Sequence, residues 1–277
     1  MNRLVGAKVA ITSNRPQTTR TEIRGVRTTP TSQVVFLDTP GLHKPRTALG
    51  ERTNRRALAS LGEVDLVCQL VDATAAIGPG DRFVADAVHQ VATPCILAVN
   101  KVDRASKAAV AEHLATALER LGDYDVFVPL SAKTGDGTDT LLDELEARLP
   151  EGPAYYPDGV VTDQPETVLA AEVLREKLLA HARDELPHSI TVSCEVDESG
   201  GPSRDADLLR LHALVHVERE SQKGMVIGRG GRVLKEAGTA ARHELEALLG
   251  TRIHLETKVR VERDWQRRPA SLDRLGY

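Results

Sequence analysis

Aromatic side chains are scarce in this sequence of 277 residues, where Phe, Trp and Tyr together make up only 3%. A platform of several exposed aromatic side chains that stack on nucleic-acid bases is therefore not expected. The hydrophobic cores must instead be aliphatic, built from Val, Leu, Ile and Ala. The formal charge of −4 argues against a protein that coats nucleic acid with its whole surface, although it leaves room for a local basic face.

Cysteines, long apolar runs and export signals are also lacking. The three cysteines, Cys68, Cys95 and Cys194, lie far apart in apolar segments, which predicts buried thiols in a reducing compartment rather than a disulfide set or a metal cluster. No apolar run approaches the ~18 residues of a membrane-spanning helix. The N-terminus has no basic segment followed by an apolar core, as a signal peptide would. We expect a soluble protein that is not exported.

The length permits two domains, and the sequence pattern changes once along the chain. Between residues 21 and 149, strand-like runs alternate with helical stretches, with strands predicted at 23–29, 33–38, 65–73, 94–100 and 125–130. This alternation predicts an α/β domain, a doubly wound and mostly parallel sheet with helices on both faces. Four prolines and two glycines within residues 150–165 then predict a linker between a first domain, 1–149, and a second, 166–277.

The second domain is expected to be an α+β fold with the order helix, strand, strand, helix, helix, strand. The first helix is predicted over residues 166–186, two strands over 189–196 and 209–218, and the last strand over 251–262. Alternate strand residues and one side of the long helix before the last strand would face the core. The predicted core residues are Ile190, Val192, Cys194, Val196, Leu234, Ala237, Ala241, Leu245, Leu248, Ile253, Leu255, Val259 and Val261.

Three short motifs each follow a predicted strand of the first domain: DTPG at 38–41, NKVD at 100–103 and SAKTG at 131–135. Because ligands of doubly wound sheets bind at the carboxyl ends of the strands, the three motifs are predicted to form one nucleotide site. The Asp103 carboxylate can accept hydrogen bonds from the ring N–H and the exocyclic amine of guanine, a donor pair that adenine lacks. This chemistry favours GTP over ATP.

Each motif has a predicted role. Asn100 ties the base to neighbouring loops, the Lys101 stem covers the ring, and the Ala132 amide donates to the guanine carbonyl. Asp38 holds Mg²⁺ through water, and the Gly41 amide approaches the γ-phosphate. Capping or turn formation is the alternative role for Asp38 and Asp103. The predicted GTP-binding residues are Asp38, Thr39, Pro40, Gly41, Asn100, Lys101, Asp103, Ser131, Ala132 and Lys133.

The phosphate-binding motif G-x-x-x-x-G-K-[ST], which would hold the rest of the phosphate chain, occurs nowhere in these residues. Residues 1–20 instead look like the last turns of the helix that follows such a loop, and then a switch segment with Thr18 and Thr19. Leu42 stands where many GTPases place a glutamine that orients water, a role that leucine cannot fill. His43 is a weaker candidate for the base.

The chain resembles the Era family of bacterial GTPases over essentially its whole length. The resemblance is carried by KVAITSNRPQTTR, DTPGLHKP, NKVD, SAKTG, LREKLL, KGMVIGRGG and the terminal SLDRLGY. It implies a P-loop GTPase fold that lacks its first strand here, with a gap between the strands at 33–38 and 65–73. It also implies Mg²⁺ held near Asp38 and Thr19. We expect that the phosphate loop was lost upstream because an internal Met was taken as the start, with a genuine pseudo-GTPase as the alternative.

A G-x-x-G loop at residues 228–231 lies within the element order of a type II KH domain, whose loop clamps about four nucleotides of RNA backbone. Six basic residues against two acidic ones between Arg219 and Arg242 give this part a local positive balance, although a solvated helix face is the alternative. Trp265 is expected to be a packing anchor. The predicted RNA-binding residues are Lys223, Ile227, Gly228, Arg229, Gly230, Gly231 and Arg232.

The family resemblance implies a monomeric cytoplasmic GTPase that binds the 3′ region of 16S rRNA and assists assembly of the 30S ribosomal subunit. Peripheral contact with the inner face of the cell membrane is left open. Two other functions remain. One is an RNA-binding KH protein whose nucleotide domain is inactive because the phosphate loop is absent. The other is a GTPase of a sister family whose C-terminal domain docks protein, against which the intact G-x-x-G argues.

Overall fold

The computed structural model describes residues 1–13, 18–182, 186–197 and 208–277. The chain divides into two compact units. The first unit comprises residues 1–7, 24–46 and 50–162, and the second comprises residues 8–23, 47–49 and 163–277. Residues 8–23, which the sequence analysis included in the first domain, thus belong to the second unit.

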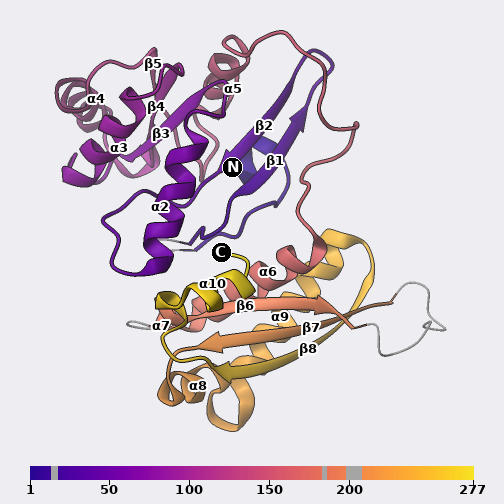
Figure 1. The fold of residues 1–277 in the computed structure, drawn as a ribbon. Coiled ribbons are helices and arrows are strands. Elements are labelled where there is room, and N and C mark those ends of the chain that lie inside the picture. Colours follow the sequence, from indigo (N-terminus) through magenta and orange to yellow (C-terminus); the bar gives the residue numbers. More distant parts are fainter. Residues whose placement is uncertain (14–17, 183–185, 198–207) are drawn as a thin grey trace. The chain divides into compact units, whose positions relative to one another are not determined.

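The strands of the first unit form two separate sheets (Figure 1). Strands β1 (Ile23–Thr28) and β2 (Gln33–Asp38) form one, and β3 (Val67–Asp72), β4 (Cys95–Asn100) and β5 (Val126–Pro129) form a parallel sheet with β4 in the middle. Among the described residues, no strand pairing joins β2 to β3. The gap that was expected at this position is present.

Helices cover both faces of the three-stranded sheet, so β4 is buried on both sides and reads as a continuous apolar run. Ile96, Leu97, Ala98 and Val99 are all 0% exposed. Leu97 packs with Ala117 and Leu121, whereas Ile96 packs with Leu141 and Leu145 on the other face. The helices are α1 (Asn2–Val5), α2 (Ala48–Ser60), α3 (Pro79–His89), η1 (Val102–Arg104), α4 (Lys107–Leu121) and α5 (Thr138–Glu146).

Local sequence signals explain where two of these helices begin. The hydroxyl of Ser106 accepts a hydrogen bond from the Ala109 amide and so caps α4. Pro79 is the first residue of α3, and the Asp81 carboxylate accepts from the Gly78 amide one turn back. The predicted linker is attached to the first unit, since the Val26 amide donates to the Val161 carbonyl over 2.8 Å.

The second unit has a single three-stranded sheet with β7 in the middle, antiparallel to β6 and parallel to β8. The predicted element order is confirmed. The elements are α6 (Glu166–His181), α7 (Leu186–Ser189), β6 (Thr191–Val196), β7 (Leu208–Val217), α8 (Glu220–Ile227), η3 (Arg229–Gly231), α9 (Arg232–Leu249), β8 (Arg252–Val261), η4 (Trp265–Arg267) and α10 (Pro269–Arg274). Helix α6 ends at His181, and residues 183–185 of the predicted helix lie outside the described part.

Helices α6 and α9 pack against each other and against the sheet to form the core of the second unit. Leu174 and Leu245 are 0% exposed in this core. The predicted core positions Val196 and Leu248 are wrong, because they are 48% and 37% exposed. Both lie at the end of an element, and in the last turn of α9 Leu249 packs against the core instead.

The three cysteines are free thiols, with Cys95 buried and Cys68 and Cys194 half-buried. Burial raises the pKa of Cys68 to about 12, so this thiol stays protonated. Within the described residues, no helix is long and apolar enough to cross a membrane.

Candidate nucleotide and RNA sites

The NKVD and SAKTG motifs meet at the ends of β4 and β5. The Asn100 side-chain oxygen accepts hydrogen bonds from the Lys101 amide at 2.8 Å and from the Ala132 amide at 3.0 Å. The Val102 amide donates to the Leu130 carbonyl, which adds a second tie between the two loops. The Ala132 amide, predicted to donate to guanine, donates to Asn100 here. We call Asp72, Asn100, Lys101, Asp103, Ser131 and Ala132 the strand-end corner.

One of the two carboxylate oxygens of Asp103 is held by a hydrogen bond. The Ser131 hydroxyl donates to its Oδ1 over 2.6 Å, and Ser131 itself is 0% exposed. The same hydroxyl accepts from the Thr134 amide, so its orientation is fixed by the SAKTG turn. Asp103 is exposed, so its carboxylate is accessible from solvent. The carboxylate is thus pre-oriented to accept a pair of N–H donors.

Lys101 has the left-handed backbone conformation, with φ of 67°, which is uncommon outside glycine. Its ammonium group contacts the Asp72 carboxylate at 2.6 Å. Burial alone would raise the pKa of Asp72, but hydrogen bonds from Lys101 and Thr74 outweigh it and lower the pKa to about 2. Asp72 was not among the residues predicted from the sequence, although it ends a strand as Asp38 and Asn100 do.

The DTPG motif lies at the end of β2, in the other sheet of the first unit. Pro40 is buried and Gly41 is exposed, with open space around the position of its missing Cβ. His43 stabilises this loop: its Nδ1–H donates to the Gly41 carbonyl over 2.9 Å, and its backbone bonds the Asn54 side chain. His43 thus has a structural role in the loop, and Leu42 is half-buried.

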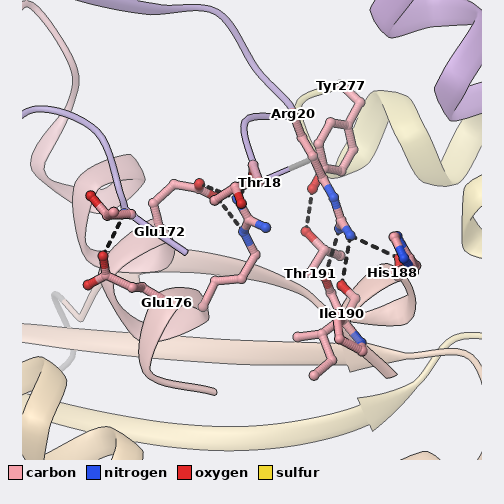
Figure 2. Close-up of polar contacts among 11 residues, drawn as sticks. Thr18, Arg20, Glu172, Glu176, His188, Ile190, Thr191 and Tyr277 are labelled. Carbon is pink, nitrogen blue, oxygen red and sulfur yellow. Dashed lines mark hydrogen bonds and ion pairs between the residues drawn. The ribbon is translucent and has the colours of Figure 1, made fainter. Parts of the chain in front are cut away.

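The predicted switch residues Thr18 and Thr19 belong to the second unit, whereas Asp38 belongs to the first. The Arg175 guanidinium of α6 donates to the Thr18 carbonyl. Figure 2 shows Thr18 beside α6, close to Glu172, and Arg20 further along the same segment. Asn14 to Gln17 of the switch segment lie outside the described residues.

Residues 228–231, which we call the glycine loop, join α8 to α9. Gly228, Gly230 and Gly231 have φ of 73°, 61° and 79°, values that other residues rarely adopt. A Cβ on Gly228 would lie 2.5 Å from Cγ2 of Val233, so only glycine fits there. The loop ends at the N-terminus of α9, and the first-turn amides and the dipole of a helix favour an anion at such a position.

Cationic side chains surround this loop. Arg229 and Arg232 are exposed, while Lys223 and Ile227 are half-buried. Arg232 also pairs with Glu236 at 2.8 Å. Met225, which was not predicted from the sequence, is 60% exposed and stands two residues before Ile227. A shallow depression continues along α9 and is lined by Gly230, Arg232, Lys235, Glu236, Thr239, Ala240 and His243.

Two family models match the chain. One, described as "50S ribosome-binding GTPase", matches residues 1–101. The other, described as "KH domain", matches residues 185–266 and so includes the glycine loop.

Relatives match the chain from end to end. GTPase Era of Mycobacterium avium (strain 104) is 49% identical, and that of Mycobacterium sp. (strain JLS) is 48% identical, each over 100% of this chain and 92% of the relative. Two solved structures also cover 100% of the chain. One is an Era in complex with MgGDPNP and nucleotides 1506–1542 of 16S ribosomal RNA, with a TM-score of 0.94, 35% identity and 92% of that protein covered. The other is a variant of Aquifex aeolicus Era bound to GDP and AlF4⁻, with a TM-score of 0.93, 36% identity and 93% covered. The chain belongs to the Era family of GTPases.

Proposed function

We propose that this protein binds GTP with Mg²⁺ through its first unit and the 3′ region of 16S rRNA through its second unit. In this function it acts as a GTPase that assists assembly of the 30S ribosomal subunit. The support comes from family membership and from relatives solved with MgGDPNP, with GDP and with an rRNA fragment.

The observation that carries the nucleotide half of this proposal is the strand-end corner. Ser131 holds one carboxylate oxygen of Asp103, and this exposed carboxylate is accessible to two N–H donors from one guanine edge. Asn100 fixes the adjoining loop through the Ala132 amide. For Mg²⁺ we assign Asp38 of the first unit, because a carboxylate oxygen suits this ion, whereas the implied ligand Thr19 belongs to the second unit. Thr39, Pro40, Gly41, Lys101 and Lys133 complete the assigned nucleotide residues.

Saturation-transfer NMR tests the guanine assignment, because it detects weak ligands. We expect GDP to receive saturation from the protein and ADP to receive none. In Asp103→Asn, the amide presents a donor where guanine requires an acceptor, so GDP should lose its signal and xanthosine diphosphate should gain one. Asp123→Asn, an exposed aspartate outside the motifs, is the matched control. An unchanged guanine preference in Asp103→Asn would show that the base site is misassigned.

For the RNA half we assign Lys223, Ile227, Arg229, Arg232 and the three glycines of the glycine loop. The positive φ angles of those glycines and the exposed Arg229 support the assignment, since phosphates can approach bare main chain next to a cation. We keep 1–149, 150–165 and 166–277 as the proposed first domain, linker and second domain, with residues 8–23 of the first domain packing with the second unit. We also propose a monomeric, cytoplasmic protein, and contact with the membrane surface is left open.

A second candidate function is an RNA-binding protein without GTPase activity. It is favoured by one observation, which is that these 277 residues contain no G-x-x-x-x-G-K-[ST]. The same saturation-transfer experiment separates the two candidates: a GDP signal that Asp103→Asn abolishes supports the GTPase, whereas no GDP signal with intact RNA binding supports the RNA-binding protein.

A further inference from the structure

Side chains from three different parts of the second unit meet outside its hydrophobic core. Ser193 belongs to β6 and His216 to β7, and Glu262 directly follows β8. Because side chains alternate along a strand, Ser193 and His216 lie on the face of the sheet opposite to Val192 and Val215, which belong to the core. We call Ser193, His216 and Glu262 the serine cluster.

Two hydrogen bonds join the side chains of the serine cluster in a row. The Ser193 hydroxyl lies 3.0 Å from Nε2 of His216, and Nδ1 of the same ring lies 3.0 Å from the Glu262 carboxylate. Burial lowers the pKa of His216 despite the attraction of Glu262, so the ring is neutral near pH ~7. A neutral ring carries a single N–H and a carboxylate can only accept, so Nδ1 carries the proton and Nε2 accepts from the Ser193 hydroxyl.

Glu262 is held in place through its other carboxylate oxygen. Arg274 of α10 forms an ion pair with Oε1, while Oε2 contacts His216. The side chains of Glu262 and His216 are only 10% and 4% exposed. Because an unmatched polar atom would be costly in such a buried place, the carboxylate fixes the orientation of the ring.

Strand β6 runs from a covered end to an open end, with Ser193 between them. At the covered end Thr191 is 2% exposed, and its hydroxyl lies 2.5 Å from that of Tyr277 (Figure 2). At the open end Glu195 is exposed and Val196 is 48% exposed. Ser193 itself is half-buried. A small molecule can therefore approach Ser193 from the open end of β6, while the imidazole behind it stays buried.

A hydroxyl, an imidazole and a carboxylate that are hydrogen-bonded in this order activate the hydroxyl as a nucleophile. The imidazole removes the hydroxyl proton while the oxygen attacks an electrophilic carbon. The carboxylate keeps the ring in the required tautomer and stabilises the imidazolium that forms. The neighbouring Cys194 does not compete, because burial raises its pKa to about 11 and the thiol stays protonated. Ser193, and not the adjacent thiol, is therefore the side chain that is prepared to attack.

We propose that Ser193 is a nucleophile that accepts an acyl group from a small activated carboxylic ester, with His216 as the base and Glu262 as the positioning residue. A bond forms between Oγ of Ser193 and the carbonyl carbon of the ester, and the bond from that carbon to the leaving alkoxide or phenolate oxygen breaks. The Ser193 proton passes to Nε2 of His216 and from there to the departing oxygen. The product is an acyl ester of Ser193. The serine cluster shares no residue with the proposed guanine and RNA sites and needs neither ligand.

Acetylation of the full chain by p-nitrophenyl acetate tests this proposal, with the acetyl group located by mass mapping of peptides. We expect a burst of p-nitrophenolate and an acetyl group on Ser193. Ser193→Ala should abolish the burst. Ser221→Ala, the matched change at an exposed serine of α8, should leave the burst and the rate of acetylation at Ser193 unchanged.

The base and the positioning residue have separate tests. His216→Gln cannot take up the hydroxyl proton, so acetylation of Ser193 should slow by about 100-fold or more. Glu262→Gln should slow it by about tenfold or more, because an amide can also donate to the ring and so favour the wrong tautomer. The nitrogen NMR shifts of His216 should show the Nδ1–H tautomer in the unaltered chain and a mixture in Glu262→Gln, a change that a purely structural role of Glu262 does not require.

Two results would overturn the proposal. One is acetylation of lysines or tyrosines with Ser193 unmodified, and the other is an equal rate at Ser193 in the unaltered chain and in His216→Gln. If His216→Gln does not fold, a fluorophosphonate replaces that variant in the test. This reagent phosphonylates serines that a base activates, with loss of fluoride, so the unaltered chain should be labelled at Ser193. Absence of this label would show that the Ser193 hydroxyl is not activated.

Discussion

The strand-end corner of the first unit and the glycine loop of the second, which are the proposed guanine and RNA sites, are built in opposite ways. In the corner, side chains are tied down: Asn100 and Ser131 each bond a neighbouring loop, above a strand that is fully buried. In the loop, three glycines leave the main chain bare and Arg229 is exposed. To distinguish one base from another, a site needs acceptors in fixed places, whereas binding to phosphates needs close approach and mobile cations. Substitutions should therefore act on base preference in the first site and on salt-dependent affinity in the second.

The largest effect on stability is expected from a methyl group at Gly228. Gly228→Ala places a Cβ against Val233 and forces a positive φ on alanine, which should cost the second unit about 2 kcal/mol or more. Gly41→Ala is the matched change in the first unit, where the position has open space and no positive φ, so it should leave the melting temperature nearly unchanged. The free energy of unfolding of both variants, measured by chemical denaturation, tests these two expectations. Equal stability of the two variants would contradict the geometry of the glycine loop.

Acid should destabilise the second unit through His216, which is 3% exposed. A carboxylate only accepts, so Nδ1–H donates to Glu262 over 3.0 Å and Nε2 accepts from the Ser193 hydroxyl over 3.0 Å. Burial lowers the pKa of His216, despite the opposing attraction of Glu262. Burial would raise the pKa of Glu262, but the Ser271 hydroxyl, Arg274 and His216 outweigh it and lower that pKa.

The lowered pKa values of His216 and Glu262 both make the folded second unit less stable as the pH falls. Because the unfolded chain binds the His216 proton more readily, this contribution to stability is complete above pH ~6.5 and is lost as the pH falls through the folded-state pKa. Glu262 adds a further loss at lower pH, below ~4.3. Thermal melts at pH ~7.5 and ~5.5 should show a falling melting temperature, with a smaller fall in His216→Gln. A melting temperature that rises on acidification would contradict this assignment.

The smallest effect is expected at Arg242. Its guanidinium contacts both carboxylate oxygens of Glu246, at 2.9 Å and 2.8 Å, so much of its charge is already matched. Arg242→Ala should keep RNA affinity within about twofold and leave the salt dependence unchanged. Lys223→Ala should instead reduce the slope of log K against log salt by about one unit, because Lys223 lies next to the glycine loop. A similar loss of slope in Arg242→Ala would assign a phosphate contact to Arg242.

Much of the fold could be predicted from local patterns. The run at 95–99 is apolar throughout because β4 is covered on both faces, and the alternating burial from Leu211 to Val215 in β7 reflects one face covered by the core. Val196 and Leu248 show where periodicity fails. At the end of a strand or helix the neighbouring element no longer covers the position, so an apolar residue there can face solvent.

Long-range ion pairs could not be predicted in the same way. Lys101, which follows β4, forms an ion pair with Asp72 at the end of the neighbouring β3. Lys8 forms an ion pair with Glu176, which lies 168 positions away in the sequence. Nothing in the spacing of such common charged residues specifies their partners. For the same reason, the sequence analysis placed Thr18 and Thr19 with the nucleotide motifs, whereas the buried Arg175 holds this segment in the second unit.

The most direct test of the comparison is a salt series of RNA affinity for the unaltered chain and for a variant with both Arg229→Asp and Gly230→Asp. Two carboxylates and added bulk where phosphates must lie should reduce the affinity by about 100-fold or more and flatten the salt dependence. The fold should persist, because both residues are exposed, the position of the missing Cβ of Gly230 has open space, and aspartate is one of the residues that tolerate a φ of 61°. Unchanged affinity in this folded double variant would contradict RNA binding at the glycine loop.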